Sequence, residues 1–310
     1  MNIREVMEVA LKEVTASYLR CARSRLLVVF VYTWPALISF LMSSRSFPQA
    51  TLLDALKMTF AVTLMAFGVY FYNDLMDIND DINNLELGNP TPASRPFGSG
   101  EISGERLKNF ILFSSIASLL LAYSISLNVL GLALAYLILG FLYSTEPFRL
   151  KKRYLMKQLI LAAGTLIVVL VGAYTAGGFT TPIMYLMVLH FIICVGLNPL
   201  LDIRDIRGDR VMGVKSIPVI WGPEMTIRLY FASIVIIGGA TLVGYSSMGF
   251  NMAMPLLVLM IVGAWIYVSL PLLSRWDDPV FLNDYAFKRI LPFYIVLQLV
   301  PLIGLMNLPF

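Results

Sequence analysis

The chain has 310 residues, of which 58% are hydrophobic and only 14% are charged, whereas about a quarter of the residues in an average soluble domain are charged. A mean hydropathy of +0.79 excludes a water-soluble globule, and two cysteines are too few for a disulfide-rich secreted domain. The formal net charge is +4, and no basic patch interleaved with aromatic residues indicates nucleic-acid binding. These observations predict an integral membrane protein that does not bind nucleic acid.

The first 25 residues differ from the rest because they mix charged and apolar positions. Ile3, Val6, Leu11 and Val14 recur at helical spacing among acidic and basic residues. This pattern is typical of an amphipathic helix that lies on a membrane surface. We therefore expect an interfacial helix over residues 1–25, followed by a single membrane domain over residues 26–310.

Nine apolar runs follow, each about as long as a helix that crosses a hydrocarbon layer of roughly 30 Å. They cover residues 26–42, 52–72, 110–127, 129–143, 158–176, 182–201, 227–245, 252–273 and 290–306. The fourth run is the shortest, and only Asn128 and Gly131 interrupt its junction with the third. The sequence predicts an all-α protein with nine transmembrane helices.

The charged residues fix the expected orientation. With the N-terminus inside, 21 of the 23 basic residues fall in cytoplasmic segments, and only Arg45 and Lys57 fall outside. This bias follows the positive-inside rule. Eighteen of the 19 acidic residues also fall on the cytoplasmic side, which the rule does not require. We therefore expect a multi-pass protein of the cell membrane with a functional site of carboxylates and cations on the cytoplasmic face.

Two acidic segments, at the ends of the second and sixth runs, share one spacing. Asp74, Asp77 and Asp81 match Asp202, Asp205 and Asp209 at an offset of 128 residues. Spacing of i, i+3 and i+7 predicts that each set lies within about 60° on one helix face. Asn73 and Asn198 accompany the two sets. Opposed rows of oxygen ligands favour Mg²⁺, which is commonly bound by carboxylates together with phosphate oxygens.

Basic residues on the same face could neutralise a phosphorylated ligand. Arg95 lies in the loop between the second and third runs, and Arg149, Lys151, Lys152 and Arg153 lie between the fourth and fifth. Arg23, just before the first run, is a further candidate. The cluster at 149–153 could instead only determine topology, and Tyr143 could be an interfacial tyrosine.

The segments NDLMDINDD from Asn73 and DIRDIRGD from Asp202, with the loops RPFGSGEIS from Arg95 and YSTEPFRLK from Tyr143, resemble the UbiA superfamily of intramembrane prenyltransferases. The resemblance extends over nearly the whole chain. It implies a central cavity capped by cytoplasmic loops, and transfer of an isoprenyl group, such as geranylgeranyl, from its diphosphate to a lipophilic acceptor. Because position 147 is proline, the chain looks closer to members that act on chlorins or glyceryl lipid phosphates than to those that act on aromatic acids.

The resemblance also implies roles for individual residues. The expected ligands of two Mg²⁺ ions are Asn73, Asp74, Asp77, Asp81, Asn198, Asp202, Asp205 and Asp209. The expected diphosphate ligands are Arg23, Arg95, Tyr143, Arg149 and Lys151, and the expected catalytic residues are Asp77, Asp205, Lys151 and Tyr143. The protein should contact an isoprenyl diphosphate donor, a lipophilic acceptor and membrane lipid.

Two alternatives remain. A divalent-cation transporter or channel would also place acidic residues in membrane helices, although its carboxylates should lie near mid-span. His190, the single histidine, lies within the sixth run. It is expected to form a hydrogen bond between helices, with a role as catalytic base as the less favoured interpretation.

Overall fold

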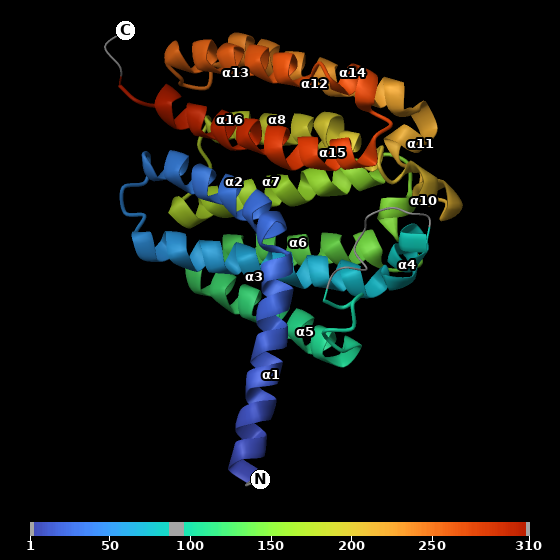
Figure 1. The fold of residues 1–310 in the computed structure, drawn as a ribbon. Helices are drawn as coiled ribbons and strands as arrows, with labels where there is room; N and C mark the ends of the chain where they lie inside the picture. The colour runs from blue at the N-terminus through green and yellow to red at the C-terminus, as the bar shows by residue number, and fades with distance from the viewer. Residues whose placement is uncertain (1–2, 87–95, 308–310) are drawn as a thin grey trace.

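The computed structural model describes residues 3–86 and 96–307. Within these ranges nine helical segments are long and apolar enough to cross a membrane. They form the body of the molecule and run side by side (Figure 1). All nine predicted spans are therefore confirmed, although the third begins earlier, at Gly104, and the ninth begins at Val280.

The first half of the chain contributes six helices. After α1 (Ile3–Ser24) come α2 (Leu26–Ser44), α3 (Leu52–Met76) and the short α4 (Ile78–Glu86), followed by α5 (Gly104–Ile125) and α6 (Leu127–Ser144). Four of them, α2, α3, α5 and α6, pack around a shared core. Ser126 alone separates α5 from α6. Its extended backbone ends one helix, and its hydroxyl accepts a hydrogen bond from the Val129 amide at 3.2 Å to cap the next. The shortest predicted span is therefore a full helix with its own cap.

In the second half of the chain, short helices and irregular turns interrupt the long helices more often. It comprises the 3-10 turn η2 (Leu150–Lys152), α7 (Met156–Ala176), α8 (Ile183–Ile192), the π-helical turn η3 (Ile193–Leu197), α9 (Pro199–Asp202), α10 (Ile206–Val211) and α11 (Ile217–Trp221). It ends with α12 (Pro223–Gly244), α13 (Ala253–Ser269), α14 (Leu272–Arg275), α15 (Pro279–Tyr285), the π-helical turn η4 (Ala286–Ile290) and α16 (Leu291–Gly304). The breaks gather at the end of the bundle that also carries α4, which we call the motif end (Figure 1).

Close helix packing joins the two halves. A Cβ atom at Gly172 on α7 would come within 2.1 Å of the Ala36 carbonyl oxygen on α2, so only glycine permits this approach. Beside it, the Ser39 hydroxyl donates a hydrogen bond to the Val169 carbonyl at 2.6 Å. On the other side of α2 packs α16, the last helix of the chain. The first and last spans thus lie together, and they flank the largest cavity described below.

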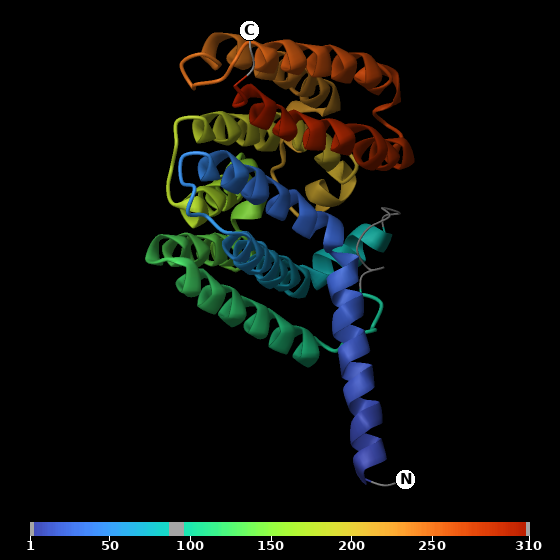
Figure 2. The ribbon, with the colours of Figure 1, turned by 90° about the vertical axis from the view of Figure 1, so that its left-hand side faces the viewer.

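The N-terminal helix α1 is set apart from the bundle. In both views it runs across the direction of the spans and projects away from them (Figures 1 and 2). Its last turns are held by packing, since Ser17 and Cys21 are buried, and by an exposed ion pair of Arg20 with Glu101 at 3.1 Å. The direction of α1 thus differs from that of the spans, and its expected place on a membrane surface stays a prediction.

Candidate active site at the motif end

Both acidic motifs break their helix at the second aspartate. Asp77 follows the last residue of α3 with φ −104° and ψ 4°, and Asp205 precedes α10 with φ −97° and ψ 6°. The expectation that each motif forms one continuous helical stripe is therefore wrong. The charges themselves give the physical reason, because three carboxylates on one face repel one another and a break lets them point in different directions.

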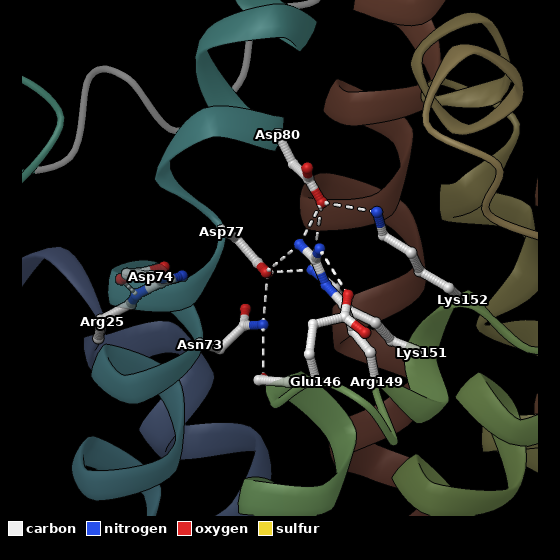
Figure 3. A network of polar contacts seen from close by, with 10 residues as sticks. Arg25, Asn73, Asp74, Asp77, Asp80, Glu146, Arg149, Lys151 and Lys152 are labelled. Carbon is white, nitrogen blue, oxygen red and sulfur yellow. Dashed lines mark hydrogen bonds and ion pairs between the residues drawn. The ribbon is translucent and has the colours of Figure 1, made fainter.

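The first motif meets the basic loop that follows α6 (Figure 3). Asp77 forms an ion pair with Lys151, lies 3.4 Å from Arg149 and accepts a hydrogen bond from the Asn73 side chain. Asn73 also donates to the Ser144 hydroxyl at 3.0 Å. The structure thus brings Asn73 and Asp77 of the first motif together with Arg149 and Lys151 of the basic loop. Asp77 and Arg149 are 72 positions apart in the sequence.

Asp80 is part of this cluster but was not among the predicted ligands. Its carboxylate lies 2.6 Å from Arg149 and 3.6 Å from Lys152. Burial disfavours the charged form of Arg149, but its acidic neighbours Asp80, Glu146 and Asp77 outweigh burial and raise the guanidinium pKa. The basic loop is therefore held over the first motif by two carboxylates, one of which lies outside the repeated spacing.

Asp74 points away from the cluster and pairs with Arg25 at the start of α2 (Figure 3). The Arg25 guanidinium makes two hydrogen bonds to its carboxylate, one of them at 3.1 Å. The side chains are only 7% and 5% exposed, and the guanidinium also lies over the Tyr70 ring, 5.7 Å from its centroid. Asp74 therefore joins α3 to α2, and the structure does not bring it together with Asp77.

The second motif has different partners. Asp202 forms an ion pair with Lys157 at 2.6 Å and accepts a hydrogen bond from Gln158 at 3.0 Å, both from the first turn of α7. Asp205 pairs with its neighbour Arg204 through two hydrogen bonds of 3.0 Å. One oxygen of Asp209 has no hydrogen-bond partner among the described residues. Burial, opposed by Lys157, raises the pKa of Asp209 to about 6.

The two motifs converge at the motif end. Helices α4 and α10, which continue the two motifs, pack against each other. Between the motifs, Tyr143 lies within electrostatic range of both Asp77 and Asp202. The Lys215 amide donates a hydrogen bond to the Lys152 carbonyl at 3.1 Å and so ties the basic loop to the segment after α10. The carboxylates of both motifs and the cations of the basic loop thus lie together at the motif end.

Two cavities extend from this region into the bundle. The larger, about 630 Å³, is lined near the motif end by Arg25, Asn198 and Arg204, and deeper in the bundle by apolar and aromatic residues of α2, α7, α8 and α16. The smaller, about 220 Å³, begins at Asn73 and Tyr143 and lies among α2, α3, α6 and α7. Tyr32, Tyr70 and Leu161 border both cavities. The polar site therefore opens onto space that can accommodate apolar molecules.

Three predicted residues are not placed at the site. Arg23 is exposed on α1, whereas Arg25, two positions later, lines the larger cavity. Asp81 lies in α4, but its side chain is outside the described part of the structure, as is the whole of Arg95. Their expected roles stay predictions.

Besides Asp80, sequence reasoning missed Arg25, Lys157 and Gln158. The sequence did contain a signal for two of them, Arg25 and Lys157. Arg25 and Lys157 are charges at the very start of apolar runs, where an unpaired charge would be expensive and a partner is expected. Nothing in the sequence indicated which carboxylate each one would meet.

The comparison with protein families decides the relationship. The family model described as UbiA prenyltransferase family matches residues 32–280. The chain belongs to this family. The match includes both acidic motifs and the basic loop, so the intramembrane prenyltransferase assignment no longer depends on short motifs alone.

Curated relatives in the family include enzymes for two kinds of product. The chain is 29% identical over 157 residues to digeranylgeranylglyceryl phosphate synthase of Thermococcus sibiricus. This match covers 49% of the chain and 53% of the relative. It is 30% identical over 151 residues to the bacteriochlorophyll synthase 33 kDa chain of Rhodobacter capsulatus. This match covers 44% of the chain and 46% of the relative. The matched segment is thus about half the length of each of these relatives.

Solved structures agree over nearly the full length. A UbiA homologue from Archaeoglobus fulgidus bound to DMAPP and Mg²⁺ has a TM-score of 0.72 at 19% identity, and covers 94% of this chain and 100% of that one. A structure reported for digeranylgeranylglyceryl phosphate synthase has a TM-score of 0.70 at 23% identity, and covers 96% and 100%. The nine-span fold is therefore that of the UbiA prenyltransferase family, and the chain is a multi-pass membrane protein.

Proposed function

We propose that this prenyltransferase takes an isoprenyl diphosphate, with geranylgeranyl diphosphate as the first candidate, and transfers its isoprenyl group to a lipophilic acceptor. The acceptor is either a glyceryl lipid phosphate or a quinone or other aromatic precursor. The observation that carries this proposal is the convergence of two acidic motifs and a basic loop directly above two cavities. A diphosphate bound there would leave its hydrocarbon in the bundle.

The residues of the motif end fit a hard divalent cation. The available ligands are carboxylate and amide oxygens of Asn73, Asp77, Asn198, Asp205 and Asp209, the types that Mg²⁺ prefers. One oxygen of Asp209 is buried without a hydrogen-bond partner among the described residues, as a group awaiting a cation would be. We propose that these residues, with Asp202, hold two Mg²⁺ ions, which would neutralise charge on the departing diphosphate.

The chain's own cations would complete the diphosphate site. Arg149 and Lys151 already meet carboxylates of the first motif, so a diphosphate entering beside Asp77 would lie within their reach. There they would stabilise the charge that develops as the bond between C1 and oxygen breaks and its electron pair leaves with the diphosphate. The nucleophile of the acceptor then bonds to C1 and releases its proton.

Membrane placement follows from the same features. The positive-inside bias supports a position of the motif end at the cytoplasmic surface of the cell membrane, and α1 would lie along that surface as a separate interfacial helix before the membrane domain. Both substrates would then enter from the lipid while the diphosphate is released to water.

The test is a transfer assay. Purified protein with Mg²⁺ and radiolabelled geranylgeranyl diphosphate is offered geranylgeranylglyceryl phosphate, 4-hydroxybenzoate or 1,4-dihydroxy-2-naphthoate. We expect a labelled product and stoichiometric pyrophosphate with one of them, and loss of both in Asp77→Ala. No product with any acceptor, combined with Mg²⁺ flux into liposomes that contain the protein, would favour the transporter alternative.

A further inference from the structure

Two polar side chains of the sixth span meet partners from other helices. The His190 Nε2 on α8 lies 3.2 Å from the Gln298 Oε1 on α16, which confirms the expected hydrogen bond between helices. At the end of the span, Asp202 meets α7. The Lys157 ammonium lies 2.6 Å from one carboxylate oxygen, and the Gln158 amide donates to the other at 3.0 Å. Side chains of another helix therefore occupy both oxygens of an expected metal ligand.

The ion pair of Lys157 with Asp202 is largely shielded from water. Its side chains are 19% and 7% exposed, whereas those of the pair of Lys288 with Asp284 are 71% and 54% exposed. A low local dielectric strengthens the attraction between buried charges, and removing one partner of such a pair is costly. Lys157 is therefore a fixed part of the second motif and not a solvated lysine beside it.

Lys157 also determines the charge of the second motif. Arg204 balances Asp205 through its own ion pair. Lys157 lies within electrostatic range of the other two carboxylates, Asp202 and Asp209. One ammonium group against these two carboxylates leaves a single negative charge. A divalent cation would reverse the sign of that charge, unless an anion enters with it or the ammonium moves away.

A diphosphate would give the ammonium another partner. Lys157 is within electrostatic range of Tyr143, and Tyr143 is also within range of Asp77. One residue thus links Lys157 with the proposed diphosphate site. A lysine has a flexible four-carbon stem and three rotatable donors, so its ammonium can exchange a carboxylate for a phosphate oxygen while its backbone stays in α7.

We propose that Lys157 competes with a divalent cation for Asp202 and thereby makes tight metal binding depend on diphosphate. The ammonium holds the carboxylate when no diphosphate is bound, and turns to the diphosphate when one enters, which frees Asp202 as a metal ligand. Two cations on one carboxylate repel each other in a largely buried site. This inference rests on the proposed function and adds a coupling to it, since the metal and the anion then favour each other's binding.

The experiment compares three lysine-to-methionine variants. Lys157→Met removes the ammonium and retains an unbranched apolar stem. Lys215→Met removes the same charge from an exposed lysine whose amide bonds to the basic loop, and it reports the effect of net charge near the site. Lys288→Met breaks the exposed pair with Asp284, and it reports the effect of losing a lysine–aspartate contact elsewhere.

Two affinities are measured on detergent-solubilised protein. Electron paramagnetic resonance detects bound Mn²⁺, which prefers octahedral oxygen ligands as Mg²⁺ does. Without pyrophosphate, Lys157→Met should bind Mn²⁺ about tenfold more tightly than wild type. In EDTA, calorimetry should show that the same variant binds pyrophosphate about tenfold more weakly. Both controls should stay within about twofold of wild type in each measurement.

A second variant covers a loss of folding in Lys157→Met. Lys157→Gln retains a hydrogen-bond donor near Asp202 without the charge, and the same two changes in affinity are expected in it. The melting temperature of either variant should rise more with Mn²⁺ than that of wild type, because an ion that binds the folded protein more tightly stabilises it more.

Three results would overturn the inference while the proposed function stands. The first is unchanged or weaker Mn²⁺ binding in Lys157→Met and Lys157→Gln, as expected if Lys157 only supports the fold. The second is an unchanged pyrophosphate affinity in both variants. The third is an effect in Lys215→Met as large as that in Lys157→Met, which would reduce the role of Lys157 to net charge. A wild type that releases no pyrophosphate with any acceptor would instead refute the proposed function, whatever the Mn²⁺ affinities are.

Discussion

The two acidic motifs share a backbone break but differ in how their carboxylates are occupied. In the first motif Asp74 and Asp77 both meet cations from distant segments, Arg25 and the loop after α6. In the second motif Asp202 also meets a distant cation, Lys157, but Asp205 pairs with its own neighbour, Arg204, and Asp209 has one oxygen without a described partner. The difference indicates that the first motif fixes the basic loop in place, whereas the second leaves oxygens available for a cation.

The largest expected effect tests whether the two motifs bind Mg²⁺ and whether the second is the more open to it. Asp77→Asn and Asp205→Asn should each lower the rate of pyrophosphate release about 10²–10³-fold, since each removes a proposed carboxylate ligand of the Mg²⁺ ions that would neutralise the leaving group. If the second motif is the more open one, Asp205→Asn should also raise the Mg²⁺ concentration for half-activation more than Asp77→Asn does. Steady-state rates over a Mg²⁺ series measure both quantities.

A matched control is available in α15. Asp284→Asn makes the same chemical change at an exposed residue that pairs with Lys288, and it should leave the rate within about twofold of wild type. Equal Mg²⁺ dependence of the Asp77 and Asp205 variants would contradict the difference between the motifs.

The next largest effect is a loss of folding stability when the buried ion pair of Asp74, in the first motif, is broken. Arg25→Met removes the guanidinium that Asp74 meets in a buried ion pair, and it should lower the free energy of unfolding by about 3 kcal/mol. Arg25→Met with Asp74→Leu should recover part of that loss because no buried carboxylate then remains. Denaturant unfolding in detergent micelles gives the values.

The exposed ion pair of Arg20 with Glu101 serves as the reference. Its side chains are 50% and 48% exposed, so Arg20→Met should cost less than about 1 kcal/mol. A loss in Arg25→Met no larger than this would show that the buried pair does not hold α2 to α3.

The smallest effect sharpens the role of Asp80. This carboxylate holds Arg149 and Lys152 and so competes with any anion for them. Asp80→Asn should strengthen pyrophosphate binding in EDTA about fivefold, equivalent to roughly 1 kcal/mol. Isothermal titration calorimetry measures the affinity.

Glu146→Gln provides the comparison for Asp80→Asn. Glu146 also lies 3.2 Å from Arg149, but its side chain is 65% exposed. Solvent screens such a pair, so the change in pyrophosphate affinity should stay below about twofold. Weaker pyrophosphate binding in Asp80→Asn than in wild type would show that Asp80 orders the loop more than it competes with the anion.

The spans were predictable from sequence because the thickness of the hydrocarbon layer imposes a minimum apolar length. The third span began earlier than expected because α5 tolerates Arg106 and Lys108 in its first two turns, where long basic side chains can reach water. The ninth includes a π-helical turn and a charged first stretch. Hydropathy locates the middle of a membrane helix better than its ends.

The site was predictable in composition but not in pairing. The spacing of the aspartates indicated two related motifs, and the loop at 149–153 was recognised as basic. The break at Asp77 and the inclusion of Asp80 could not be predicted, because an ideal helix was assumed to continue through the motif. The partners of Asp74 and Asp202 depend on how α2 and α7 pack against their neighbours, and local spacing contains no such information.

The π-helical turn η3 has a consequence for how the second motif can change. Within it the Asn198 amide bonds to the Ile193 carbonyl, five residues back, at 2.9 Å, so the turn holds one residue more than a regular helix would. Because this wide turn fits one extra residue into about the same arc, deleting a single residue from 193–197 would restore ordinary helix with Asn198 and Asp202 still facing their present neighbours. If the same residues formed ordinary helix without a deletion, both side chains would turn by roughly the 100° that one residue occupies. The extra residue therefore sets the direction in which the second motif points, without any change to its aspartates.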